Sequence, residues 1–173
     1  MPLYRNGIVA LVVLVAVTFQ VAVFNLFSVN GVVPDLALVV VVAATLSRGP
    51  RFGAGVGFVA GLLLDLAPPA DHVAGRWALA LVVVAALAGR VRTEARRNSL
   101  AGMLTVAICS FAGGSVFALT GVVLGDHALP VGQMVAVVAI GVLWDVVVTP
   151  LVLPLVMVLF DRTRSTRSTE LAY

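Results

Sequence analysis

Long apolar runs, broken by short polar segments, occupy most of this 173-residue chain. Six of these runs are long and apolar enough to form helices in a lipid bilayer. They occupy residues 8–29, 32–47, 52–66, 77–89, 100–125 and 134–160. The pattern therefore predicts an all-α integral membrane protein, with six transmembrane helices in one compact bundle.

The polar breaks contain residues that begin helices. Asn30 and Gly31 interrupt the apolar pattern, and Pro34 and Asp35 follow them. Backbone amides in the first turn of a helix have no partner within the helix, so proline, which has no amide hydrogen, is well tolerated there. An acidic side chain at that end of a helix interacts favourably with the helix dipole. Pro34 and Asp35 are therefore predicted to lie in the first turn of the second helix.

The second, third and fourth runs are short for membrane spans. Each has about 13 to 16 apolar residues, or about 20 to 24 Å of helix, against a bilayer core of about 30 Å. The second and third could instead form a re-entrant hairpin. That arrangement would place Arg48 and Arg51 inside the bilayer, at about 2.5 to 3.5 kcal/mol each. Full spanning is therefore the preferred interpretation.

The basic residues predict the orientation of the six helices. All eleven are arginines, and cytoplasmic loops of membrane proteins collect basic residues. With the N terminus in the cytoplasm, only Arg76 lies outside. The other ten, which lie inside, are Arg5, Arg48, Arg51, Arg90, Arg92, Arg96, Arg97, Arg162, Arg164 and Arg167. Both termini are therefore predicted to be cytoplasmic.

Composition limits the remaining possibilities. Hydrophobic residues make up 61% of the chain and charged residues 11%, whereas soluble domains are usually near 45 to 50% and 25%. Six helices use residues 1–160, and the polar tail at 161–173 is predicted to be disordered. The arginines are scattered between apolar runs and form no basic patch, so nucleic acid is not an expected partner.

No pattern of catalytic or metal-binding residues is evident. His72 and His127 are the only histidines, and they follow Asp71 and Asp126 in predicted outer loops. No serine or cysteine is spaced to be activated by them, and Cys109 lies alone in an apolar run. The sequence therefore predicts a protein that is not an enzyme and has neither metal nor cofactor.

A strip of small residues follows one face of the third helix. Gly53, Gly57 and Gly61 recur every four residues, and Asp65 extends the strip by one turn. Small residues at this spacing let helix backbones approach closely in lipid. The strip predicts either a helix contact inside the chain or a docking face for another membrane protein.

A second strip, on the sixth helix, contains an acidic residue at membrane depth. Gly141, Asp145 and Thr149 are four residues apart, and Pro150 and Pro154 follow, where they would loosen the helix. A carboxyl group there must be protonated, hydrogen-bonded or exposed to a wet cavity. Candidate hydrogen-bond partners are Gln20, Ser110, Ser115 and Thr120. Three roles remain open for Asp145: a structural polar contact, a contact with a partner protein, or the handling of a ligand or proton.

Together these residues resemble the MreD family of bacterial rod shape-determining proteins. The resemblance is best from Pro34 to about Arg92. The residues that carry it lie at the start of the second predicted helix, along the third and near the end of the sixth. They are Pro34, Asp35, Leu36, Gly57, Phe58, Gly61, Leu62, Leu63, Asp65, Thr149, Pro150 and Pro154.

The resemblance implies a membrane component of the elongasome, the machinery for cell shape and lateral peptidoglycan synthesis. The implied partners are an MreC-like single-span protein, an MreB-like actin homologue and a glycosyltransferase and transpeptidase pair. The implied fold is similar to that of the substrate-binding subunits of energy-coupling-factor transporters. This similarity leaves an alternative function, a small-ligand-binding membrane subunit of such a transporter. Its pocket would use outer polar groups such as Asn25, Asp65, Asp71 and His72.

Overall fold

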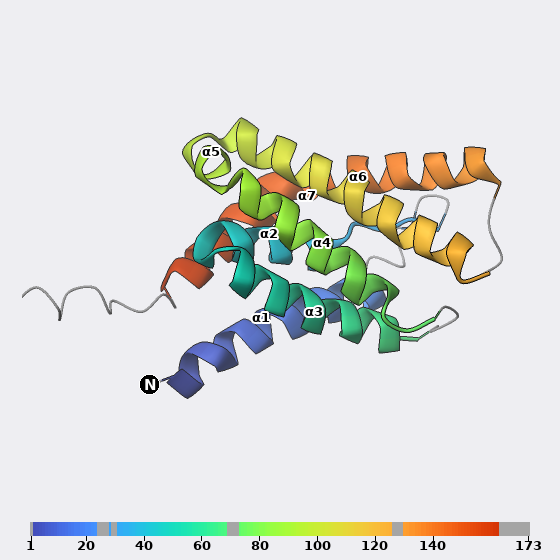
Figure 1. Cartoon of the computed structure of the whole chain (residues 1–173). Coiled ribbons are helices and arrows are strands. Elements are labelled where there is room, and N and C mark those ends of the chain that lie inside the picture. Colours follow the sequence, from blue (N-terminus) through green and yellow to red (C-terminus); the bar gives the residue numbers. More distant parts are fainter. Residues whose placement is uncertain (1, 24–27, 29–30, 69–72, 126–129, 163–173) are drawn as a thin grey trace, which may run out of the picture.

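The computed structural model describes residues 2–23, 28, 31–68, 73–125 and 130–162, and these residues form seven helices and no strand (Figure 1). The helices are α1 (Pro2–Ala22), α2 (Leu36–Arg48), α3 (Pro50–Leu66), α4 (Arg76–Arg90), α5 (Arg92–Arg97), α6 (Ser99–Val123) and α7 (Val131–Arg162). Each predicted apolar run overlaps one of the six long helices. The predicted helical class is confirmed.

Several boundaries differ from those predicted. The first helix begins at Pro2 and ends at Ala22, earlier than 8–29. Residues 90–99, which separate the fourth and fifth predicted helices, contain the short helix α5. Asn98 follows α5 and caps α6 by accepting a hydrogen bond from the Leu100 amide. Helix α7 continues unbroken through Pro150 and Pro154, so neither proline ends it. The predicted tail lies outside the described residues from position 163 onward.

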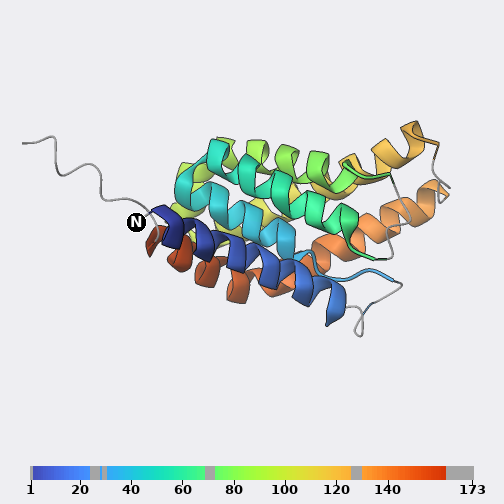
Figure 2. The same ribbon diagram turned by 90° about the horizontal axis from the view of Figure 1, so that it is seen from below.

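Helix α2 forms the centre of the bundle. Every residue from Leu36 to Ser47 is buried, and α2 contacts all six of the other helices (Figures 1 and 2). Most of its residues are valine and alanine, whose small side chains allow neighbours to approach from every side. The hydrophobic core of the protein is therefore built around α2.

Asp35 caps the start of α2. Its Oδ1 accepts a hydrogen bond from the Leu38 amide at 2.9 Å. This satisfies one of the amides that a helix start leaves unbonded, an interaction worth about 1 kcal/mol. Pro34 precedes the cap, so its predicted place in the first helical turn is wrong by two residues.

The glycine strip packs α3 against its neighbours inside the chain. A Cβ built on Gly53 would collide with Thr45 Oγ1 of α2, and one built on Gly57 would lie 2.8 Å from the Leu81 carbonyl oxygen of α4. At Gly61 it would overlap the backbone of Ala78. The strip is thus an internal helix contact, and its interpretation as a docking face is wrong because these glycines are covered by the chain itself.

The long helices alternate in direction along the chain. Asp35, which precedes α2, and Ser47 of α2 lie beside Asp145 and Met157 of α7, so α2 and α7 run parallel. Gly57 and Gly61 lie against Leu81 and Ala78 respectively, so α3 is antiparallel to α4. Gly102 and Gly114 lie against Leu153 and Val138 respectively, so α6 is antiparallel to α7. Figure 2 shows α1 starting at the end where α7 finishes.

Arginines gather at one end of the bundle, which we call the basic end. Arg92 donates from Nε to the Leu46 carbonyl at 2.7 Å and from Nη2 to the Ser47 carbonyl at 2.9 Å. Arg96 also donates to the Leu46 carbonyl and forms an ion pair with Asp161 at 2.9 Å. Two arginines of α5 thereby cap the C terminus of α2, where carbonyl groups lack helical partners.

Two helices, α6 and α7, are long and apolar enough to cross a membrane. They have 25 and 32 residues, or about 38 and 48 Å, against a bilayer core of about 30 Å. Within their most apolar stretches, only 28% of α6 and 11% of α7 is buried. Exposed apolar helices of this length fit a lipid environment, which supports membrane association.

Candidate functional site

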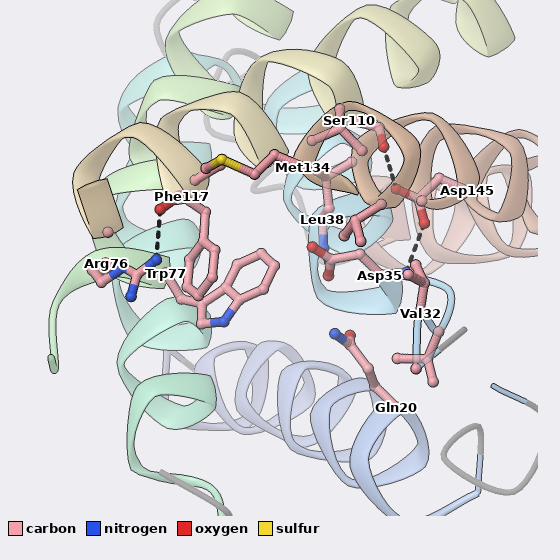
Figure 3. Close-up of a pocket in the computed structure, with 18 of the residues that line it drawn as sticks. Gln20, Val32, Asp35, Leu38, Arg76, Trp77, Ser110, Phe117, Met134 and Asp145 are labelled. Atoms are coloured by element: carbon pink, nitrogen blue, oxygen red, sulfur yellow. Dashed lines mark hydrogen bonds between the residues drawn. The ribbon is translucent and has the colours of Figure 1, made fainter. Parts of the chain in front are cut away.

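A cavity of about 350 Å³ lies at the end of the bundle opposite the basic end. Figure 3 shows side chains that line it. Its lining comes from α1, α2, α4, α6, α7 and the segment that precedes α2. Most of the lining is apolar, including Leu38, Phe117 and Val138. Predominantly apolar walls with a few placed polar groups are typical of small-molecule sites.

Five polar or charged side chains contribute to this lining, and all are buried. They are Gln20, Asp35, Arg76, Ser110 and Asp145. Asp145 is 1% exposed and Asp35 is 8% exposed. Two acidic side chains so close to full burial are unusual, since ionisable groups are rarely buried unless they are paired or functional.

Asp145 joins three elements of the bundle. Its Oδ1 accepts from the Asp35 amide at 2.6 Å, and its Oδ2 accepts from the Ser110 hydroxyl at 2.6 Å. The Thr149 hydroxyl donates to the Asp145 carbonyl one turn earlier, at 2.5 Å. Asp145 thus links α7 to α6 and to the start of α2, and its predicted hydrogen bond with Ser110 is confirmed.

Two other expected partners of Asp145 bond elsewhere. Gln20 accepts from the Ala37 amide at 3.0 Å through Oε1, which fixes the end of α1 against α2. The Thr120 hydroxyl donates back to the Val116 and Phe117 carbonyls within α6. Gln20 nevertheless lines the same cavity as Asp145.

Aromatic rings form one wall of the cavity. The rings of Trp77 and Phe117 stack with their centroids 4.4 Å apart. The Arg76 guanidinium lies 4.1 Å from the Phe117 centroid and donates from Nη2 to the Phe117 carbonyl at 2.8 Å. Figure 3 shows Phe117 between Arg76 and Trp77. Gly121 leaves room for this arrangement, because a Cβ at this position would overlap the Arg76 guanidinium and displace it.

Asp65 positions this wall without lining the cavity. Its carboxylate accepts from the amides of Gly75 at 2.8 Å, Trp77 at 3.0 Å and Ala78 at 3.2 Å. These amides lie at the start of α4, where a carboxylate is favoured both by the unbonded donors and by the helix dipole. Asp65 therefore orients the turn that presents Arg76 and Trp77.

The structure brings some of the predicted site residues together and separates others. Gly141 and Asp145 line the cavity, while Thr149 is buried behind them. Pro150 is exposed, so it takes no part in the cavity. The outer polar groups proposed for a pocket lie outside the described residues, apart from Asp65. The pocket residues that lie outside are Asn25, Asp71 and His72. Asp126 and His127 also lie outside the described residues.

Sequence patterns did not reveal the pairing of Asp35 with Asp145, or the roles of Arg76, Trp77 and Phe117. One signal was present: Asp35 and Asp145 both lie within long apolar runs, where an acidic side chain is energetically costly. The aromatic wall carries no comparable signal, because single aromatics in apolar runs are common.

Over the residues that the structure describes, the fold and the cavity define an all-helical protein with two candidate membrane spans and a buried acidic site. Comparison with protein-family models, with curated proteins and with solved structures finds no match.

Proposed function

We propose that the chain is a six-span protein of a bacterial plasma membrane, with both termini in the cytoplasm. The alternating direction of the long helices supports this topology, because successive spans must cross in opposite directions. The segregation of arginines supports the orientation, since a basic end faces the cytoplasm. In this topology the cavity lies in the outer half of the bundle.

We further propose that the chain acts in the elongasome as an MreD-like, non-enzymatic component that holds or regulates its partners. The observation that carries this proposal is the structural role of the residues on which the resemblance rests. Asp35 caps α2 and bonds Asp145, Asp65 caps α4, and Gly57 and Gly61 set the distance between α3 and α4. These four residues each make a contact between helices, which supports the proposal that the resemblance reflects a shared fold.

The expected direct partner is an MreC-like single-span protein. Helices α6 and α7 offer exposed apolar surfaces to a membrane helix, with Ile108 at 62% and Leu151 at 75% exposure. Membrane helices associate through close packing, for which these uncovered faces leave room. An MreB-like actin homologue and a glycosyltransferase and transpeptidase pair complete the proposed set of partners, beside the surrounding membrane lipids.

Affinity purification from native membranes tests this proposal. A tagged copy is solubilised in mild detergent, and co-purifying proteins are identified by mass spectrometry. We expect an MreC-like protein and other elongation proteins, at levels well above those recovered with an unrelated tagged membrane protein. Recovery of the chain without any elongation protein would contradict the proposal.

The cavity favours a second candidate function, a small-ligand-binding membrane subunit of an energy-coupling-factor type transporter. Its supporting observation is the outer-half cavity of about 350 Å³ with its five buried polar side chains. The same purification separates the two candidates. Recovery of an energy-coupling transmembrane subunit with its ATPases would favour the transporter subunit over the elongasome component.

A further inference from the structure

We propose that the cavity binds a small organic cation, an amine with an apolar body. In this assignment the ammonium group contacts the carboxyl groups of Asp35 and Asp145, and the apolar body lies against Trp77. The assignment rests in part on the second candidate function, for which it names the ligand chemistry. It does not require any energy-coupling partner, because binding belongs to the chain alone.

The two carboxyl groups have accepting capacity left for a ligand. Asp35 accepts from the Leu38 amide and lies beside the Gln20 side chain and the Ala37 amide, and Asp145 accepts one hydrogen bond on each side-chain oxygen. An ionised carboxylate offers about four acceptor sites. Each group is therefore held in place by the protein and can still accept from an ammonium donor. Charge-assisted bonds of this kind are roughly twice as strong as neutral ones.

The arrangement of charge around the cavity favours a cation over an anion. The acidic pair comes from the start of α2 and the middle of α7. The guanidinium in the lining, that of Arg76, is engaged with the ring and carbonyl of Phe117. Figure 3 shows Arg76 beyond Phe117 when viewed from Asp35 and Asp145. A positive ligand group placed at the acidic pair therefore meets two carboxyl groups at close range.

The walls favour an organic cation over a bare metal ion. Among the described residues, no group of three histidine, cysteine or acidic side chains could hold a metal. The stacked rings of Trp77 and Phe117 and the side chains of Leu38 and Val138 offer contact area for a hydrocarbon body. An aromatic face also attracts cations directly. The volume of about 350 Å³ suits one small molecule, since ligand cavities run from about 300 to 1,000 Å³.

Binding can be followed through Trp77 in the full chain purified in detergent. The second tryptophan, Trp144, is changed to Phe so that Trp77 alone reports by fluorescence. The probes are phenethylamine, 2-phenylethanol and phenylacetate, which share a body and differ in charge. We expect phenethylamine to bind at least about tenfold more tightly than the alcohol, because the alcohol lacks the charge. We expect the weakest binding from phenylacetate.

Two substitutions locate the charge that the amine recognises. Asp145→Asn and Asp35→Asn keep the side-chain shape and an oxygen acceptor but remove the charge. Each should weaken phenethylamine binding at least about tenfold and leave binding of 2-phenylethanol unchanged. The control is Asp161→Asn, which removes a carboxylate that is paired with Arg96 at the basic end. This control should bind both probes as the parent does.

Three results would overturn the assignment. They are equal binding of amine and alcohol, displacement of the amine by sodium at matched ionic strength, and unchanged amine binding in both Asp35→Asn and Asp145→Asn. If the two variants do not fold, the comparison of amine with alcohol on the parent chain still decides the question. Failure of the transporter proposal would appear separately, as purification without an energy-coupling subunit.

Discussion

Asp65 and Asp145 are both buried to 1% exposure, yet they act differently. The Asp65 carboxylate accepts from three backbone amides of one turn, so its contacts serve the start of α4. Asp145 instead accepts from separate elements and also faces the cavity. Removal of Asp65 should therefore affect folding, whereas neutralisation of Asp145 should affect ligand recognition.

Asp65→Ala should lower the free energy of unfolding by about 2 kcal/mol, because loss of a capping side chain costs about 0.5 to 2 kcal/mol and buried amides are left unbonded. Asp65→Asn should cost less, since its oxygen still accepts one or two of these bonds. Unfolding in detergent, followed by circular dichroism against added denaturant, measures both. Glu94→Ala on the exposed face of α5 is the control. Equal effects at Asp65 and Glu94 would show that the cap is unimportant.

At the scale of elements, small residues determine how closely the helices pack. Gly61 of α3 lies against the backbone of α4, and Gly53 lies against Thr45 of α2. In contrast, a Cβ on Gly55 of the same helix meets nothing within 4 Å. The chain therefore provides a matched pair of glycines, one in a close helix contact and one at the surface.

Gly61→Ala should be strongly destabilising, by about 1 to 3 kcal/mol, because α3 and α4 must separate to admit the methyl group. Gly55→Ala should be neutral or stabilising by a few tenths of a kcal/mol, since alanine is the better helix former. Thermal unfolding of both variants in the same detergent tests the contrast. Similar unfolding temperatures for the two would contradict the close packing of α3 on α4.

Sequence reasoning was most successful where the signal was local. Apolar runs located six long helices, and the four-residue spacing of Gly53, Gly57 and Gly61 located a packing strip. It was less successful where partners are far apart in the chain: the bond between Asp35 and Asp145 joins residues 110 positions apart. The cavity depends on five helices at once, so no run or motif encodes it. Helix α5 was missed because six residues show too little periodicity.

At the scale of the whole molecule, the two ends of the bundle differ in charge. The basic end contains the α5 arginines that cap α2, and the opposite end contains the cavity. In the proposed topology the basic end faces the cytoplasm and the cavity end faces outward. Residues exposed at each end allow this orientation to be measured.

Single cysteines at opposite ends should label from opposite sides of the membrane. In a Cys109→Ala background, Glu94→Cys lies on α5 at the basic end and Ala74→Cys lies just before α4 at the cavity end. An impermeant maleimide should label Ala74→Cys in intact cells, and Glu94→Cys only in inverted vesicles. Labelling of both from the same side would contradict the six-span topology.

The enclosure of α2 has a consequence for the biogenesis of the protein. This helix of 13 residues is about 20 Å long and has no face left for lipid. Its contacts with α7, from Asp35 at one end to Ser47 at the other, involve a helix that is synthesised about 100 residues later. The surroundings of α2 are therefore incomplete until α7 has been synthesised. Nascent chains truncated before α7 should consequently be retained by insertion factors or degraded by membrane proteases.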